Sequence, residues 1–260
     1  GMGMFGAALA TCVAPCIGIL ISSTHFLRRK NSFRPVRCAF SGKQTRGILS
    51  LGVSSLITEV SSGIVMLLFN QILLSLSGNV GVAAYGIIAN LALIVVSIFT
   101  GVAQGIQPIV SRSFGSGQMR HVKQIFHYGV ITAAAFGLLF LGIGWFFSQP
   151  IVGIFNQENN LEMERLASQG LPLYFLAFPM MGVNILASSY LASLSKGGPA
   201  FVLSVLRGAA AVIPAVLLLS RLFGITGVWL AVPCAEALTF LVFLAMLPFC
   251  FRRPQKGAGA

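Results

Sequence analysis

The stretch RGILSLGVSSLITEVSSGIVMLLFNQILLSLSG, from Arg46 to Gly78, decides the fold of this protein. It is a long apolar run with a single acidic residue, Glu59, near its middle. At about 1.5 Å per helical residue, Glu59 lies about 20 Å beyond Arg46, close to the midplane of a hydrocarbon core about 30 Å thick. A charge at that depth costs about 2.5–3.5 kcal/mol, so such residues usually face a protein interior or a wet cavity. The stretch therefore predicts a membrane-spanning helix.

Small and polar side chains share one face of this expected helix with Glu59. Steps of three and four residues bring them to the same side, while Leu, Ile and Val cover the other faces. We interpret this face as an inward-facing stripe in which Glu59 is the candidate cation-coupling residue. The neighbours on the stripe, which we expect to line a substrate cavity, are Ser55, Ser62, Met66 and Asn70.

The composition of the whole chain is that of a multi-pass membrane protein. Of its 260 residues, 56% are hydrophobic and only 8% are charged, whereas soluble domains carry about 25% charged residues. The net charge is +12, with 17 Lys and Arg against 5 acidic residues. Such a basic chain can indicate nucleic-acid binding. Here the orientation in the bilayer accounts for the charge, and we expect the lipid bilayer rather than nucleic acid as a partner.

Apolar runs long enough to cross a bilayer divide the chain. They cover residues 1–21, 47–76, 80–110, 125–147, 167–192, 200–220 and 226–249. Residues 22–46 form a basic linker between the first run and the rest, residues 47–249 form one all-α membrane domain, and residues 250–260 form a tail. Prolines lack the backbone N–H that a helix uses, so they are candidate kink sites: Pro108, Pro172, Pro179, Pro214 and Pro233.

The charges of the connecting segments predict the orientation, because Lys and Arg accumulate on the cytoplasmic side. All of the 17 basic residues except Arg165, Arg207 and Arg221 lie in the linker, in alternate connections or in the tail. We therefore expect the linker and the C-terminus to be cytoplasmic. The N-terminus is then expected outside, on an apolar run with no polar leader, and from this we expect Gly1 not to be the true start of the protein.

The chain lacks the residue patterns of the common enzyme classes. It contains no Asp, and its three histidines lie at the expected cytoplasmic edge, so no Ser/His/Asp arrangement can form. The segment GSGQMR at 115–120 lacks the lysine and spacing of a phosphate-binding loop, and the five cysteines lack metal-ligand spacing. We expect no enzyme, no catalytic residue, no cofactor and no metal site.

Two further runs carry polar or aromatic side chains. In the run 80–110, polar residues recur at helical spacings, and in lipid such groups either bond to a neighbouring helix or line a passage. In the run 167–192, aromatic residues and methionines suit flat apolar ligands but also fill helix cores. The cavity candidates from these runs are Gln104, Gln107, Tyr174, Phe178 and Asn184.

Arg207 and Glu236 lie at similar depths in two consecutive antiparallel runs. Counted from the cytoplasmic ends, their depths differ by about 6 Å, which is within the reach of an arginine. We predict a structural ion pair, and the alternative is that Arg207 extends to the lipid headgroups. Glu59 is then the one intramembrane acid without a partner. Because burial favours the neutral form of an unpaired carboxylate, a proton and a cationic substrate could compete for it.

Three stretches resemble the C-terminal half of the MATE (multidrug and toxin extrusion) transporters, in particular the bacterial MepA-like branch. The first is GVAQGIQPI at 101–109, followed by Phe114-Gly115. The second is Ile213-Pro214 after Arg207, with FGITGVWLA at 223–231. The third is Pro233-Cys234-Ala235-Glu236.

The resemblance implies a fold of two six-helix lobes around a central cavity. Residues 1–21 are similar to the last helix of the N-terminal lobe, residues 22–46 to the cytoplasmic connection, and residues 47–249 to the six-helix C-terminal lobe. It also implies export of cationic or amphipathic drugs in exchange for protons by alternating access, in a bacterial inner membrane and together with the N-terminal lobe. Sodium is the less favoured ion, because the tenth helix of sodium-coupled relatives carries an acid and residues 166–192 contain none.

Two other interpretations stay open at this point. A lipid-linked oligosaccharide flippase of the same superfamily would need several cationic residues in the cavity, and only Arg207 is available. The sequence could also belong to a half-transporter without activity of its own.

Overall fold

The computed structural model describes residues 3–27, 42–156, 159–194 and 196–250, and every regular element among them is a helix. The chain divides into two compact units, Gly1–Ile48 and Leu49–Ala260. The first contains helix α1 (Gly3–Leu27), which runs six residues past the expected end of the first apolar run. The expected linker 22–46 overlaps the ends of α1 and α2 (Gly42–Gly115), and residues 28–41 and 251–260 lie outside the described residues.

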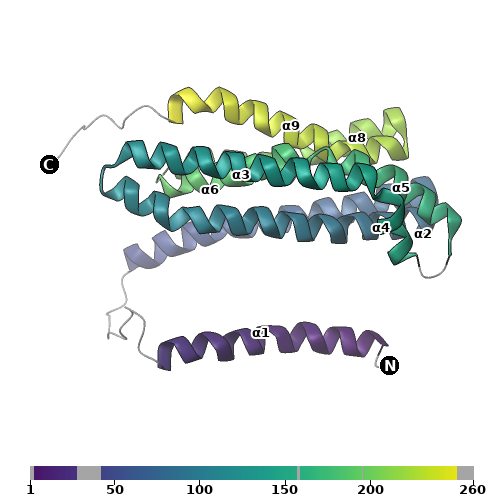
Figure 1. Ribbon diagram of the computed structural model, residues 1–260, viewed down its shortest axis with the longest axis horizontal. Helices are drawn as coiled ribbons and strands as arrows, with labels where there is room; N and C mark the ends of the chain where they lie inside the picture. Colours follow the sequence, from purple (N-terminus) through teal and green to yellow (C-terminus); the bar gives the residue numbers. More distant parts are fainter. Residues whose placement is uncertain (1–2, 28–41, 157–158, 195, 251–260) are drawn as a thin grey trace. The chain divides into compact units, whose positions relative to one another are not determined.

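Helix α2 contains two of the expected spans, because the chain folds back within it. Ser77 and Gly78 leave the helical conformation, and Gly78 has φ 60°, a value that glycine adopts without steric cost. The rings of Phe69 and Tyr85 stack with centroids 5.3 Å apart. In a straight helix these residues would be about 24 Å apart along the axis. The stacked rings therefore hold the two arms of α2 together, and Figure 1 shows the ribbon reversing there.

The remaining helices of the second unit are α3 (Met119–Phe146), α4 (Ser148–Phe155), α5 (Leu161–Phe175), α6 (Phe178–Ser193), α7 (Gly197–Val205), the π-helical turn η1 (Leu206–Ala210), α8 (Val212–Phe223) and α9 (Ile225–Cys250). Among the further spans that they form, α5 and α6 make one bent pair, and α7, η1 and α8 follow one another in a single stretch. The short helix α4 lies in a segment that the sequence predicted to be an outer loop. At about 12 Å it is too short to cross a membrane, and it is anchored by the buried Val152.

Four of the described helical stretches are long and apolar enough to span a membrane. They are Glu59–Gly115, Met119–Phe146, Gly197–Phe223 and Ile225–Leu247, and the pair α5 and α6, bent by 48°, gives a fifth. The 57 residues of the first stretch are divided between the two arms of α2. In α1, the apolar helical stretch Leu9–Thr24 is shorter. The all-α membrane fold expected from the composition is confirmed.

Two of the predicted proline sites coincide with the breaks in the helices. Pro179 lies in the first turn of α6, just after the bend. A backbone N–H in the first turn has no acceptor within the helix, so its absence in proline costs no hydrogen bond there. Pro214 cannot donate to the Ala210 carbonyl, and the preceding turn is the π-helix, in which Ala211 N donates to Leu206 O at 2.9 Å. Proline thus explains why these spans are not single straight helices.

The core of the second unit forms where small residues let helices approach closely. In α3, Gly129, Ala133 and Gly137 recur every fourth residue and are buried, and α3 packs along α6. A Cβ on Gly137 would lie 2.5 Å from Pro179 Cα. Small residues in this spacing are typical of helix interfaces in membranes, because dispersion contacts there replace the hydrophobic effect.

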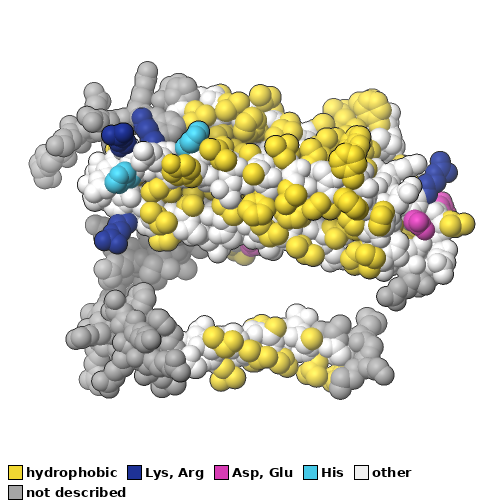
Figure 2. All heavy atoms as spheres, in the orientation of Figure 1, with side chains coloured by type: hydrophobic (Ala, Val, Ile, Leu, Met, Phe, Trp, Pro, Cys, Tyr) yellow, Lys and Arg dark blue, Asp and Glu magenta, His cyan; other side chains and the backbone are white. Residues whose placement is uncertain are grey.

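The surface of the second unit is polar at its two ends and apolar between them (Figure 2). On the face shown, Lys, Arg and His side chains gather at the end where α3 begins, and at the opposite end acidic side chains lie next to a basic one. This distribution has the polarity that the loop charges predicted.

Candidate functional site

The polar face of the first arm of α2 is exposed in the second unit. The side chains of Glu59, Ser62 and Met66 are exposed, and Asn70 is half-buried. The side chain of Ser55 lies outside the described residues. The arm packs through its other side, where Phe69 is fully buried. The predicted stripe is therefore turned away from the packed interior of this unit.

Glu59 lies on this exposed face, and Leu56, Val60 and Ile64, which are also exposed, lie to one side of it on the helix. No residue described in the structure forms an ion pair with the Glu59 carboxylate. The Glu59 side chain is therefore open to contact from outside the packed unit.

The second arm of α2 contributes a second exposed polar face. Gln104 and Gln107 are exposed there. Asn90 Nδ2 donates to Gly86 O at 2.8 Å, and Ser97 Oγ donates to Leu93 O at 2.8 Å. Both bonds stay within the helix, so these two residues do not join α2 to a neighbour. The hydrogen bonds described for Asn90 and Ser97 are thus not interhelical, and the alternative that this face lines a passage stays a prediction.

The three cavity candidates in α5 and α6 are buried in the packing of the lobe, which corrects the expectation that they line an open cavity. Tyr174 is buried, and Phe178 and Asn184 have no exposed surface. The Phe178 ring lies 6.3 Å from the Phe99 ring and 4.4 Å from the Phe175 ring, centroid to centroid. The bend between α5 and α6 turns this segment into the interface with α3, where its aromatic rings fill the core.

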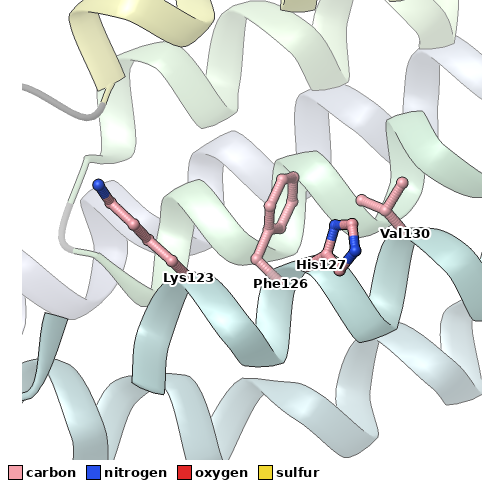
Figure 3. Close-up of a pocket in the computed structure, with 4 residues that line it drawn as sticks. All are labelled: Lys123, Phe126, His127 and Val130. Atoms are coloured by element: carbon pink, nitrogen blue, oxygen red, sulfur yellow. The ribbon is translucent and has the colours of Figure 1, made fainter. Parts of the chain in front are cut away.

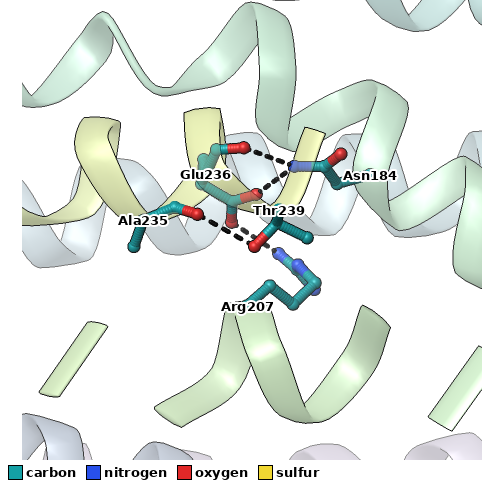
Figure 4. Close-up of polar contacts among 5 residues, drawn as sticks. All are labelled: Asn184, Arg207, Ala235, Glu236 and Thr239. Atoms are coloured by element: carbon teal, nitrogen blue, oxygen red, sulfur yellow. Dashed lines mark hydrogen bonds and ion pairs between the residues drawn. The ribbon is translucent and has the colours of Figure 1, made fainter. Parts of the chain in front are cut away.

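The predicted ion pair between Arg207 and Glu236 is present, and it belongs to a larger polar cluster (Figure 4). Arg207 Nη2, on the turn η1, lies 3.3 Å from Glu236 Oε1 on α9. Asn184 Nδ2, on α6, donates to Glu236 Oε2 at 2.7 Å and to the Glu236 backbone oxygen at 2.9 Å. The Glu236 side chain is 2% exposed and that of Arg207 is 25% exposed. One carboxylate thus holds three elements of the lobe together.

The role of Asn184 in this cluster was missed in the sequence. Asn184 and Glu236 are 52 residues apart, and no local pattern connects them. A signal was available, because an amide inside an apolar helix needs a partner. Asn184 Oδ1 and Arg207 Nε have no hydrogen-bond partner among the described residues. The cluster therefore has one acceptor and one donor that are not used in the hydrogen bonds described.

Within the described residues, no three His, Cys, Asp or Glu side chains lie close enough together to hold a metal ion. The polar groups of the second unit instead divide into an exposed face on α2 and a buried, nearly charge-balanced cluster among α6, η1 and α9. The exposed face can contact a ligand or another domain. The buried cluster stabilises the lobe.

These features define a multi-pass α-helical membrane protein, and comparison with known proteins identifies its family. The MatE family model matches residues 52–218, more than half of the chain. The chain therefore belongs to the MatE family.

Curated relatives in this family cover nearly the whole chain. The multidrug export protein MepA of Staphylococcus haemolyticus is 25% identical over 247 residues, which are 94% of this chain and 53% of that protein. MepA of Staphylococcus aureus is 25% identical over 252 residues, or 95% of this chain and 54% of the relative. The chain spans about half the length of the curated relatives it matches.

Solved structures show the same fold. An outward-facing multidrug resistance MATE family transporter of the MOP superfamily has a TM-score of 0.83 and 17% identity, with 96% of this chain and 57% of that chain covered. A MOP superfamily transporter from Pyrococcus furiosus, described as having a binding pocket of reverse polarity, has a TM-score of 0.82 and 16% identity over 97% of this chain and 58% of that chain.

Proposed function

We propose that this chain is one lobe of a multidrug efflux transporter that exports cationic or amphipathic drugs in exchange for protons. The observation that carries the proposal is Glu59, an exposed carboxylate on the polar face of a membrane-spanning helix in a MatE-family chain. The relatives named above as multidrug export proteins support the substrate class. Sodium is the less favoured coupling ion.

In the proposed mechanism, a proton and a cationic substrate compete for Glu59. When the site faces outward, protonation removes the charge and releases the substrate. When it faces the cytoplasm, loss of the proton restores a carboxylate that attracts the next cation.

Alternating access would result from rocking of this lobe against an N-terminal lobe. Such motion needs a lobe that moves as a rigid body. The bonds from Glu236 to Arg207 and Asn184 support that requirement, because they join α6, η1 and α9 inside the packed unit. The polar faces of α2, with Gln104 and Gln107, are the proposed cavity wall.

We propose a bacterial inner membrane as the location, with the C-terminus in the cytoplasm. The gathering of basic side chains at one end of the second unit supports this orientation (Figure 2), since Lys and Arg are retained on the cytoplasmic side.

The test is ethidium efflux from cells that express the protein from its intact gene. Wild type and Glu59→Gln are compared under a proton gradient and, separately, under a sodium gradient. Glu162→Gln is the matched control, because it removes the same charge from an exposed position at the end of the unit.

We expect proton-driven efflux in the wild type and in Glu162→Gln, and its loss in Glu59→Gln. Efflux unchanged in Glu59→Gln would remove the coupling role from Glu59 and leave this lobe as a cavity wall. Absence of ethidium efflux in the wild type under both gradients, with the protein present in the membrane, would contradict drug export itself.

A further inference from the structure

A pocket of about 420 Å³ opens on the surface of α3 near its first residues (Figure 3). It is lined by Lys123, Phe126, His127 and Val130. These residues follow steps of three and four, so they form one face of the helix. Lys123 and His127 supply nitrogen groups toward the start of the helix, while Phe126 and Val130 supply an apolar floor. The pocket therefore changes from polar to apolar along the helix.

Two exposed aromatic residues give the depth of this pocket in the membrane. Tyr128 is 68% exposed and Trp145 is 58% exposed, and Tyr and Trp are enriched at the two membrane–water interfaces. They are separated by about 26 Å along the helix, close to the thickness of the hydrocarbon core. Lys123 then lies about 7 Å outside the core, at the level of the lipid headgroups, and Val130 lies just inside it.

The apolar floor is held in place from behind. The Phe126 ring lies 4.2 Å from the Tyr190 ring and 6.2 Å from the Phe243 ring, centroid to centroid. Phe126 and Val130 also pack against a buried cluster that includes Ala187 and Leu203. This floor is therefore an ordered surface on which an acyl chain can lie.

The charge at this end of the second unit is positive. Helix α3 contains no acidic residue, and between Glu59 and Glu158 the sequence contains none. Among the described acids, Glu162 and Glu164 begin the distant helix α5, and Glu236 is buried against Arg207. Figure 2 shows Lys, Arg and His together at this end of the unit. The positive charge around the pocket therefore attracts a ligand more strongly the more negative charge the ligand carries.

We propose that this pocket binds an anionic phospholipid from the leaflet on this side of the membrane. The lipid phosphate lies against Lys123 and His127, and the first part of an acyl chain lies along Phe126 and Val130. The order of groups in the pocket matches that of the lipid, with the charged part at headgroup depth and the apolar part toward the membrane interior. Basic side chains next to a membrane helix attract anionic lipid headgroups electrostatically.

The test is lipid binding to the purified full chain in a neutral detergent, measured by native mass spectrometry. Phosphatidylglycerol and phosphatidylcholine with identical acyl chains are titrated separately. The test variant is Lys123→Gln/His127→Gln. The matched control is Arg120→Gln/His121→Gln, which also removes one basic side chain and one histidine from the same helix, but outside this pocket.

We expect the wild type to bind phosphatidylglycerol more tightly than phosphatidylcholine. The test variant is expected to lose about fivefold of its phosphatidylglycerol affinity through removal of the Lys123 charge, and to lose less of its phosphatidylcholine affinity. The control variant should retain the wild-type preference. Equal losses in both double variants would contradict the site and indicate a diffuse charge effect, and a wild type without preference would overturn the proposal.

A third variant tests the acyl-chain part of the site. Val130→Trp places a large ring over the floor and leaves Lys123 and His127 intact. We expect it to weaken both lipids, and we expect excess inorganic phosphate to leave phosphatidylglycerol bound to the wild type. Full binding by Val130→Trp, or displacement of the lipid by phosphate, would show that the pocket does not hold a phospholipid in this way.

Discussion

The guanidinium of Arg207 and the carboxylate of Glu236 meet across two consecutive antiparallel segments, with Nη2 and Oε1 3.3 Å apart. The turn that carries Arg207 is π-helical, and the helix that carries Glu236 follows after Gly224, which has φ 60°. A chain reversal thus places two charges at one depth. Glu236 is almost fully buried, and its carboxylate is contacted there by Arg207 and Asn184.

We first predict that Arg207→Met destabilises the lobe by about 3 kcal/mol. This is the lower end of the range for breaking a buried pair, because Arg207 keeps a quarter of its side chain exposed. The double variant Arg207→Met/Glu236→Gln should recover most of the loss, since the buried charge is gone and an oxygen remains for Asn184. The measurement is the free energy of unfolding in detergent micelles.

The control for this pair is Arg221→Met, which removes an exposed basic residue from α8 and should change stability by less than about 0.5 kcal/mol. A double variant as unstable as Arg207→Met alone would show that the buried charge is not the cause of the loss.

Asn184→Leu is expected to cost about 1.5–3 kcal/mol, because it removes a hydrogen bond to a buried carboxylate. Asn184 donates to Glu236 at two oxygens, at 2.7 and 2.9 Å. Ser188→Ala, one turn further along α6, is the matched control. Its Oγ is buried and has no partner among the described residues, so its loss should be neutral or slightly favourable. Comparable losses from both variants would indicate a packing effect.

Gly137→Ala is expected to destabilise the contact between α3 and the α5–α6 bend by about 1–3 kcal/mol. The added methyl group would lie 2.5 Å from Pro179 Cα and 2.8 Å from Phe178 O. Because both are backbone atoms, neither can rotate away. Thermal unfolding in micelles measures the effect.

Gly142→Ala is the control on the same helix, because a Cβ there has no neighbour within 4 Å. It should be neutral or stabilising, since alanine is the better helix former. If both alanines behave alike, helix propensity rather than interhelical packing governs this surface.

Asn160→Ala is expected to cost about 1 kcal/mol at the start of α5. The Asn160 side chain accepts hydrogen bonds from Glu162 N and Met163 N, both at 3.1 Å. Hydrogen exchange of those two amides should become faster in the variant. Asn159→Gly is the control, because Asn159 has φ 50° and glycine adopts that conformation at least as readily. Faster exchange in the control would point to a loop effect rather than a lost cap.

The positions of helix breaks were only partly predictable. Pro179 and Pro214 were predicted kink sites because proline cannot donate a backbone hydrogen bond. The structure has a bend next to Pro179 and a π-turn before Pro214. Pro233 lies within α9, which the structure describes as one continuous helix. A missing N–H is visible in the sequence, but whether the helix bends at that point depends on what packs against it.

By itself, the sequence determined that this protein crosses a membrane repeatedly as helices, and it predicted that Arg207 and Glu236 lie at similar depths. Both follow from composition and from the fixed rise of a helix along the bilayer normal. Only the tertiary structure decided which side of each helix is buried, and so placed Tyr174, Phe178 and Asn184 in the core and joined Asn184 to Glu236. Lipid and neighbouring helices are similarly apolar, so the sequence of residues 181–187 in α6 does not show whether they face lipid or protein. Their packing against α3 and α9 shows that they face protein.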